Sequence, residues 1–222
     1  MPFSWTIKNN RGGIPPAPGR FSTWTAIFAF VFFVVMTILV AYRITTGIDQ
    51  SGFAVSDKLI SRAMSEFMLG ITFFGNHKFL IPANLILLAW LLFKKEKVWA
   101  LFLLFCSLGG LLLKMATKGI MQRLRPSDPL IEGGVSGFSF PSGHALMSVV
   151  FYGWLMLYGQ KRFSAPWQKT SWNVFMLMMI AIVSFSRIYL HVHYLSDVVA
   201  GLGLGLAWYV VSRKLILLFK AI

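Results

Sequence analysis

Three stretches organise this chain: KGIMQRLRP at residues 118–126, SFPSGH at residues 139–144 and SRIYLHVHYLSD at residues 186–197. Long apolar runs surround all three. Six of their residues form a set of three cations, two histidines and one carboxylate, namely Lys118, Arg125, Arg187, His144, His193 and Asp197. Such a set of charges in an otherwise lipid-soluble chain is what phosphoryl transfer at a membrane surface requires.

The three cations suit a phosphate ligand. A phosphoryl group in transfer carries its charge on non-bridging oxygens, and catalysis consists mostly of placing fixed positive charge and N–H donors around them. Arg125 and Arg187 offer a planar fork that matches phosphate, and Lys118 acts as a mobile point charge. Lys118 and Arg125 are seven residues apart, which predicts that they line one face of a helix ended by Pro126.

The SFPSGH stretch predicts a helix start, because Pro141, Ser142, Gly143 and His144 open an apolar run. Free backbone N–H groups and the positive end of the macrodipole favour an anion at a helix N-terminus. Gly143 lets an oxygen approach the backbone closely. This stretch is therefore a second candidate for phosphate binding.

His193 and Asp197 are four residues apart and would share one face of a helix. The carboxylate would orient the imidazole and stabilise its cationic form, which makes His193 the better nucleophile. His144, on another stretch, would then protonate the leaving oxygen, since a pKa near neutrality suits a general acid.

Other readings of these histidines are weaker. His191 lies two residues before His193 but has no carboxylate one helical turn further on. His144, His191, His193 and Asp197 also have ligand side chains suitable for a metal-assisted hydrolase. Three nearby cations argue against that site, since they would repel a dication and supply its charge. We predict no metal and no other cofactor.

Four further polar residues lie in or near the stretches. Lys114 and Arg123 fall outside the motif spacing, and we assign them a structural or headgroup-contact role. Ser142 and Ser186 lie inside phosphate-binding stretches, and neither needs to be a nucleophile.

The three stretches resemble the signature of the type 2 phosphatidic acid phosphatase family, a membrane branch of a larger superfamily. The likeness covers about the C-terminal half of the chain. It implies that His193 forms a phosphohistidine, that Asp197 orients it and that His144 is the general acid. It also implies a metal-free phosphate site made of Lys118, Arg125, Ser142, Gly143 and Arg187.

Composition places the chain among membrane proteins. Of its 222 residues, 57% are hydrophobic and 13% are charged, whereas about a quarter of a soluble domain is charged. The net charge of +14 would suggest a nucleic-acid partner in a polar protein. Here the basic residues cluster at the ends of apolar runs, and no basic and aromatic residues alternate on a polar face. We predict no nucleic-acid binding.

The apolar runs predict an all-α, polytopic membrane protein with six transmembrane helices. The six runs are residues 24–42, 79–93, 98–117, 141–159, 172–190 and 198–212.

Two segments lie outside these runs. Residues 1–20 are basic and proline-rich and predict a cytoplasmic tail, which leaves residues 21–222 as one membrane domain. Between the first and second spans, apolar residues recur three and four apart, which predicts an amphipathic helix on the membrane surface within residues 53–71. A solvated hairpin is the other reading, and gating of lipid entry by this segment stays open.

Loop charges predict the orientation. The N-terminal tail, loops 94–97 and 161–169 and the C-terminus carry Lys or Arg, opposed only by Glu96. By the positive-inside rule, these segments and both termini are cytoplasmic. The three stretches then lie at the outward face of the inner (cytoplasmic) membrane.

The sequence therefore predicts an integral membrane phosphatase that hydrolyses a lipid phosphate or diphosphate through an intermediate on His193. Undecaprenyl diphosphate, phosphatidylglycerophosphate and phosphatidic acid all stay open, because the motifs contact phosphate rather than the lipid tail. A lipid-to-lipid phosphotransferase and a non-catalytic lipid-phosphate carrier are the alternatives. The His193–Asp197 pair with His144 argues against a carrier. The expected partners are the lipid substrate and the bilayer, with no obligate protein partner.

Overall fold

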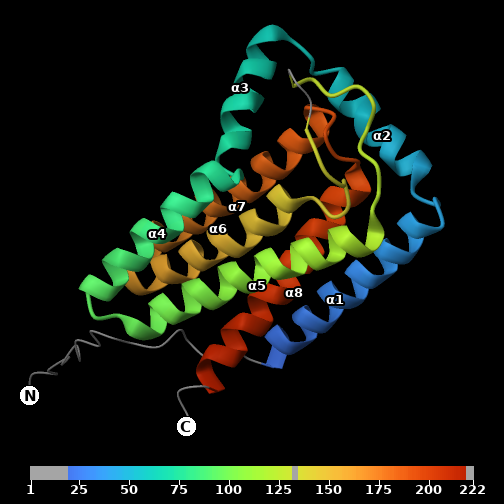
Figure 1. Cartoon of the computed structure of the whole chain (residues 1–222). Helices are drawn as coiled ribbons and strands as arrows, with labels where there is room; N and C mark the ends of the chain where they lie inside the picture. The colour runs from blue at the N-terminus through green and yellow to red at the C-terminus, as the bar shows by residue number, and fades with distance from the viewer. Residues whose placement is uncertain (1–19, 132–134, 219–222) are drawn as a thin grey trace, which may run out of the picture.

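The structure is a computed structural model that describes residues 20–131 and 135–218. Within these ranges it is all-helical, as the sequence predicts (Figure 1). The helices are α1 (Arg20–Ala41), α2 (Thr46–Asp57), α3 (Arg62–Phe73), α4 (His77–Phe93), α5 (Lys97–Met121), α6 (Gly143–Arg162), α7 (Pro166–Tyr189) and α8 (Leu195–Leu218). Of the predicted tail at residues 1–20, residues 1–19 lie outside the described residues.

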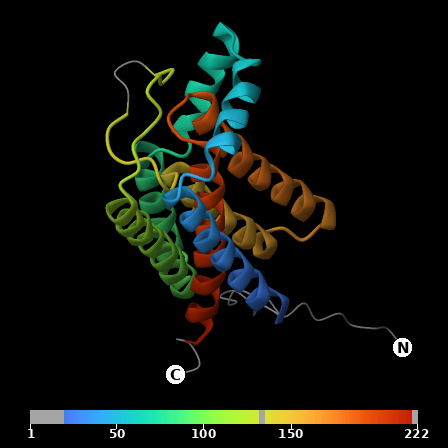
Figure 2. The ribbon, with the colours of Figure 1, turned by 90° about the vertical axis from the view of Figure 1, so that its right-hand side faces the viewer.

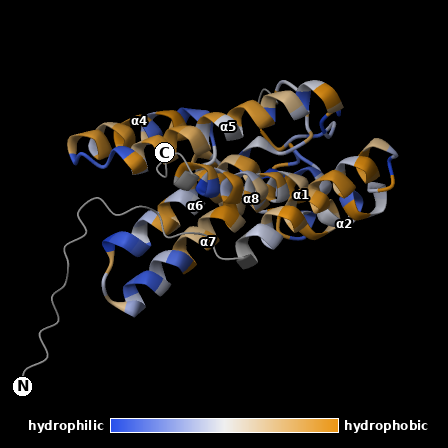
Figure 3. Cartoon of the chain, turned by 90° about the horizontal axis from the view of Figure 1, so that it is seen from below, coloured by the Kyte–Doolittle hydropathy of each residue, from blue (hydrophilic) through white to orange (hydrophobic). Residues whose placement is uncertain are grey.

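The outer faces of the helices are apolar. Phe28, Ile86 and Leu112 are 73%, 69% and 65% exposed, and Figure 3 shows hydrophobic residues along α1, α4 and α5. A surface of this kind suits hydrocarbon, in which a helix satisfies its own backbone hydrogen bonds. The chain is a multi-pass membrane protein.

Among the described residues, four helices are long and apolar enough to cross a bilayer, and a bent pair gives a fifth. The four are Thr23–Ala41, Lys97–Met121, Pro166–Tyr189 and Leu195–Ile216, and the pair is α3 with α4, bent by 40°. The predicted span at residues 141–159 corresponds to α6, which is not among them. Because α6 packs against α5, α7 and α8, protein rather than lipid covers much of its surface. A helix in this position can cross a bilayer with fewer apolar residues than a helix that faces lipid. Six spans stay a prediction.

Two helices, rather than one, connect the first span to the second. The chain breaks inside the predicted segment 53–71, where the Ser61 side chain caps α3 by accepting a hydrogen bond from the Met64 N–H at 3.3 Å. Met68 of α3 packs against Tyr189 of α7. Figures 1 and 2 show α2 and α3 at one end of the bundle. Their position at a membrane surface stays a prediction.

Glycines bring α8 close to its neighbours. A Cβ atom on Gly201 would lie 2.6 Å from the Ser142 carbonyl oxygen, and one on Gly205 would lie 2.8 Å from the Leu146 carbonyl oxygen, both on the α6 side. Gly203 faces α1 instead. Small residues allow such close helix contacts in membranes. These glycines therefore let α8 pack closely against α6 and α1.

We expect Gly201→Ala to lower thermal stability in detergent. The new methyl group would meet a backbone atom that no side-chain rotation can move, so α6 and α8 must separate, at a cost of about 1–3 kcal/mol. Gly119→Ala is the matched control, since nothing lies within 4 Å of its Cβ position. Equal melting temperatures for the two variants would show that the α6–α8 contact is loose.

Ionic and aromatic contacts tie the helix ends together at the opposite end of the bundle. Lys161 Nζ lies 2.7 Å from Glu96 Oε2, and the Tyr158 hydroxyl donates to the same oxygen at 3.0 Å. Trp154 stacks on Tyr158 with ring centroids 5.0 Å apart. The basic loop between α4 and α5 therefore meets the basic end of α6, far from α2 and α3.

Candidate active site

The three sequence stretches converge where four helix ends meet. Lys118 lies in the last turn of α5 and Arg187 in the last turn of α7. Gly143 begins α6, and Asp197 lies in the first turn of α8. The helix start predicted at SFPSGH is confirmed, with Ser142 at the N-cap position.

One cavity of about 810 Å³ collects most of the predicted site residues. Six of the eight line its wall: Lys118, Arg125, Gly143, His144, Arg187 and His193. Ser142 and Asp197 are fully buried behind it. The Ser142 N–H donates to the Asp197 carbonyl oxygen at 3.0 Å, which joins the starts of α6 and α8.

Lys118 and Arg125 reach the cavity from different elements. Helix α5 ends before Gln122, which adopts the left-handed conformation with φ 43°. The predicted helix continuing to Pro126 is therefore wrong. Arg125 lies in the following loop, where its Nε donates to the Gly137 carbonyl oxygen at 2.9 Å.

Backbone carbonyls, rather than carboxylates, hold both cations. Lys118 Nζ donates to the carbonyl oxygens of Phe138 and Ser139, and an Arg125 terminal N–H donates to that of Val192 at 2.7 Å. Among the described residues, neither cation forms an ion pair. Their charges therefore remain available to an anion in the cavity.

His193 precedes α8 instead of lying on it. Since α8 begins at Leu195, the predicted shared helix face is wrong, although the two side chains do meet. Asp197 Oδ2 lies 3.5 Å from His193 Nδ1 and accepts the Tyr194 N–H at 3.0 Å. A carboxylate in the first helical turn commonly accepts such a free N–H group, and this turn brings the pair together.

The hydrogen bonds around His193 identify its tautomer. An Arg125 terminal nitrogen lies 3.2 Å from His193 Nε2, and a guanidinium can only donate. Nε2 therefore carries the lone pair and Nδ1 the proton, facing Ser139 Oγ at 3.3 Å and Asp197. Burial lowers the pKa of His193 well below its usual range, although Asp197 opposes this effect. The ring is neutral near pH 7.

Arg123 connects Asp197 to a carboxylate that the sequence analysis missed. Its two terminal nitrogens lie 2.6 Å from Asp197 Oδ1 and 2.7 Å from Asp49 Oδ2. Asp49, on α2, also accepts the Ser196 N–H at 2.8 Å and its hydroxyl at 3.0 Å. Asp49 and Asp197 are 3% and 0% exposed, and buried carboxylates require such pairing. Arg123 thus has the structural role predicted for it.

Sequence signals for this network were weak. Arg123 lies two residues before Arg125, and Ser139 opens the second stretch, where its hydroxyl donates to Asp197 Oδ2 at 2.5 Å. Asp49 stands alone in a segment with no motif, 74 residues from Arg123. No periodicity relates residues so far apart.

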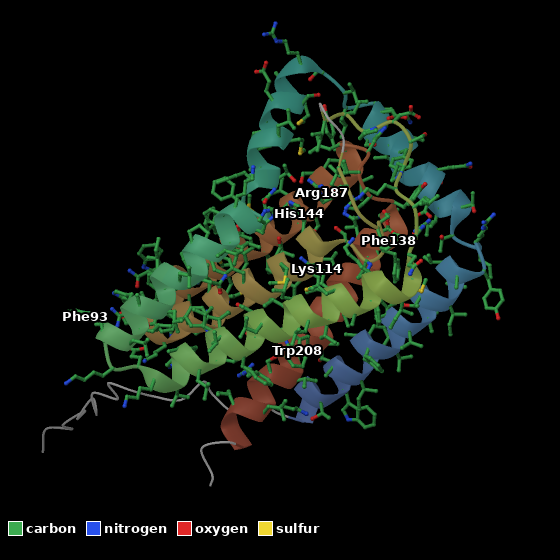
Figure 4. The ribbon with its side chains drawn as sticks, viewed as in Figure 1. Phe93, Lys114, Phe138, His144, Arg187 and Trp208 are labelled. Atoms are coloured by element: carbon green, nitrogen blue, oxygen red, sulfur yellow. The ribbon has the colours of Figure 1, made fainter. Side chains whose placement is uncertain are left out.

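His144 and Arg187 carry unpaired polar atoms in the cavity wall (Figure 4). His144 Nε2 and Arg187 Nε have no hydrogen-bond partner among the described residues. Arg187 is 3% exposed, and one terminal N–H donates to Thr72 Oγ1 at 2.5 Å. Gly75 makes room for the imidazole, because a Cβ there would lie 2.8 Å from His144 Cδ2. Buried polar atoms without partners are costly, so both groups remain available to a ligand in the cavity.

His191 lies apart from the other histidines. Its Nε2 is 2.9 Å from Asp57 Oδ1 on α2, and it does not line the cavity. Over residues 20–131 and 135–218, no three side chains of His, Cys, Asp or Glu gather as a metal site would require. The geometry therefore favours His193 over His191 and offers no cluster for the four-ligand alternative.

The cavity continues from the cations into an apolar groove between α4 and α5. Its walls there are aliphatic: Leu80, Ile81, Leu85, Leu88, Leu103, Leu104, Leu108 and Leu111. One end of the cavity thus suits an anion and the other suits hydrocarbon.

Comparison with known proteins agrees with this site. The sequence model of the PAP2 superfamily matches residues 99–219. Phosphatidylglycerophosphatase B of Bacillus subtilis is 32% identical over 80% of this chain and 87% of that protein. Undecaprenyl-diphosphatase of Sulfolobus acidocaldarius is 25% identical over 84% of this chain and 87% of that protein.

A solved structure shares the fold. The crystal structure of a transmembrane PAP2-type phosphatidylglycerolphosphate phosphatase from Bacillus subtilis superposes with a TM-score of 0.77 and 26% identity, covering 89% of this chain and 96% of that one. The family-model match spans more than half of the chain and includes all three stretches. The chain belongs to the PAP2 superfamily.

Proposed function

We propose that this protein is an integral membrane phosphatase that removes the terminal phosphate of a lipid phosphate monoester or diphosphate through a phosphohistidine at His193. The observation that carries the proposal is the two-part cavity. His193 and three cations line one end, and the leucine-rich groove between α4 and α5 forms the other. A soluble phosphate ester would need no such groove. The names of the two relatives, one for phosphatidylglycerophosphate and one for undecaprenyl diphosphate, support a lipid substrate.

In the first step, His193 Nε2 attacks phosphorus as the bond from phosphorus to the lipid oxygen breaks. Arg125 moves from Nε2 to a phosphate oxygen, because its N–H groups can serve either acceptor. His144 gives its Nε2 proton to the leaving oxygen. Phosphorylated His193 keeps the proton on Nδ1 and becomes cationic, and Asp197 stabilises that charge at close range.

In the second step, water replaces the lipid. His144, now neutral, accepts a proton from the water as its oxygen attacks phosphorus. The P–N bond breaks, its electron pair returns to Nε2 and inorganic phosphate leaves. Lys118, Arg125, Arg187 and the N–H groups around Gly143 compensate the phosphate charge in both steps. Ser142 is buried behind the wall at the N-cap, where its carbonyl oxygen accepts the Leu146 N–H at 3.1 Å.

The charge at the two ends of the bundle supports an orientation in the membrane. The basic loops 94–97 and 161–169 lie at the end opposite the site, and Arg213 and Lys214 lie near the end of α8. By the positive-inside rule, that end faces the cytoplasm. We accordingly propose that the protein has six spans, with α6 as the fourth. Both termini are then cytoplasmic, and the site lies at the outward face of the inner membrane.

We expect phosphate release to survive excess EDTA. Three protein cations supply the charge that a metal would provide, so chelation should leave the rate unchanged within about twofold. The assay measures phosphate released in detergent from phosphatidylglycerophosphate, undecaprenyl diphosphate and phosphatidic acid. Loss of activity that a divalent cation restores would contradict the metal-free mechanism. A phosphorylated second lipid in place of free phosphate would identify a phosphotransferase, and no turnover of any lipid would favour a carrier.

A further inference from the structure

One wall of the cavity comes from the elbow between α3 and α4, which lies outside all three sequence stretches. Thr72, at the end of α3, and Gly75, in the turn that follows, both line the cavity. The family-model match begins only at residue 99. Thr72 Oγ1 accepts a hydrogen bond from Arg187, and a Cβ on Gly75 would lie 2.8 Å from His144 Cδ2. Figure 4 shows Arg187 and His144 near the junction of α3 with α4. The elbow thus contacts two groups of the proposed phosphate site.

Contacts on both sides hold this elbow in place. Ser65 and Thr72 are seven residues apart on α3 and share one face of that helix. Ser65 Oγ lies 3.0 Å from the hydroxyl of Tyr189 on α7. On the other side, the Tyr152 hydroxyl of α6 donates to the Phe74 carbonyl oxygen at 2.9 Å. The face of α3 that carries Thr72 is therefore fixed against α7.

The Thr72 hydroxyl contacts another helix rather than its own. Threonine hydroxyls in helices often bond to the carbonyl oxygen four residues back, as Thr37 does with Phe33 at 2.8 Å. Thr72 Oγ1 instead accepts an Arg187 terminal N–H at 2.5 Å. Arg187 is 3% exposed, and among the described residues its guanidinium has no other hydrogen-bond partner. This one contact therefore orients the guanidinium plane.

A neutral partner suits an arginine that binds phosphate. A carboxylate would also orient the guanidinium, but it would offset the positive charge and repel an incoming phosphate. Arg123 has partners of that kind, Asp49 and Asp197. A hydroxyl oxygen accepts one N–H group and leaves the remaining N–H groups and the full charge to a ligand.

We propose that Thr72 is a positioning residue for phosphoryl transfer, because its hydroxyl holds the Arg187 guanidinium in the orientation that binds the transferred phosphate. The inference rests on the proposed function and extends the active site to α3.

The first test compares Thr72→Val with Thr72→Ser. Valine keeps the branched shape of threonine but has no acceptor for Arg187, whereas serine keeps the oxygen. We expect Thr72→Val to lower kcat/KM for phosphate release by about 10- to 100-fold, the size of a hydrogen bond to a charged group. Thr72→Ser should stay within about threefold of the native chain. The control Thr37→Val removes a hydroxyl that bonds within its own helix and should leave kcat/KM unchanged. Rates are measured well below each melting temperature, so that unfolding does not contribute.

A double variant separates positioning of Arg187 from a purely structural role. Arg187→Lys replaces the planar fork by a point charge, so this variant should already lack what Thr72 provides. Adding Thr72→Val to Arg187→Lys should then lower kcat/KM by less than about threefold further. Losses that multiply would show that Thr72 acts independently of Arg187 and would overturn the inference. Native activity in Thr72→Val would overturn it as well.

Binding of inorganic phosphate tests the same contact without turnover. We expect Thr72→Val to raise the dissociation constant of inorganic phosphate by about 3- to 10-fold and Thr72→Ser to leave it unchanged. If the native chain released no phosphate from any lipid, the proposed function would fail, and this comparison would still decide the role of Thr72. Equal constants for the native chain and Thr72→Val, or no phosphate binding by the native chain, would overturn the inference.

Discussion

His193→Gln should abolish phosphate release, with a loss of about 10³-fold or more in kcat, comparable to removal of a nucleophile in other covalent enzymes. Glutamine nearly fills the volume of imidazole but has no nitrogen lone pair to attack phosphorus. The measurement is the initial rate of phosphate release from the preferred lipid. With a ³²P-labelled lipid, alkaline quenching should also trap a protein-bound phosphate in the native chain and none in the variant.

His191→Gln is the matched control, because it removes the neighbouring histidine, which contacts Asp57 outside the cavity. This control should retain activity. If His193→Gln kept more than a tenth of the native rate, or if the label appeared on His191, the assignment of the nucleophile would be wrong.

Arg123→Gln should damage both stability and turnover. It would leave Asp49 and Asp197 buried near one another without their shared cation, and breaking a buried ion pair typically costs about 3–5 kcal/mol. We also expect kcat to fall by about 10- to 100-fold, as is typical for groups that orient a reactive side chain, with little change in KM. Thermal melting in detergent and steady-state kinetics provide the two measurements.

The double variant Asp49→Asn with Arg123→Gln separates positioning from folding. It removes one negative and one positive charge, so much of the lost stability should return. Turnover should not return, because Asp197 still lacks the guanidinium that positions it behind His193. Arg123→Lys keeps the charge but cannot bind both carboxylates in the same geometry. Its kcat and its melting temperature should lie between those of the native chain and of Arg123→Gln. Recovery of kcat in the double variant would mean that Arg123 serves only the fold.

Local spacing was sufficient to predict the candidate site residues, six of which line one cavity. SFPSGH does open a helix, and the His193–Asp197 contact arises within one short turn of chain. Such contacts depend on a few neighbouring residues, so their pattern is visible in the sequence. Even here, the geometry of the His193–Asp197 contact differs from the predicted one. Asp197 meets His193 by accepting an N–H group at the start of α8, rather than through a shared helix face.

Helix boundaries without glycine or proline were harder to place. Gln122 ends α5 in a left-handed conformation, although glutamine is not a residue that predicts the end of a helix. As a result, Arg125 approaches His193 from a loop. Similarly, Ser61 divides the segment that was predicted as one amphipathic helix. The break at Ser61 coincides with a local cap, in which its side chain accepts the Met64 N–H.

By itself, the sequence determined the membrane class and the all-helical fold, and it supplied the candidate reactive groups. These follow from apolar composition and short-range motifs, in which each residue acts through its own chemistry. Only the tertiary structure decided that Asp49 meets Arg123, that Thr72 meets Arg187 and that α4 and α5 enclose an apolar groove. These features join residues far apart in the chain, and their geometry depends on how whole helices pack.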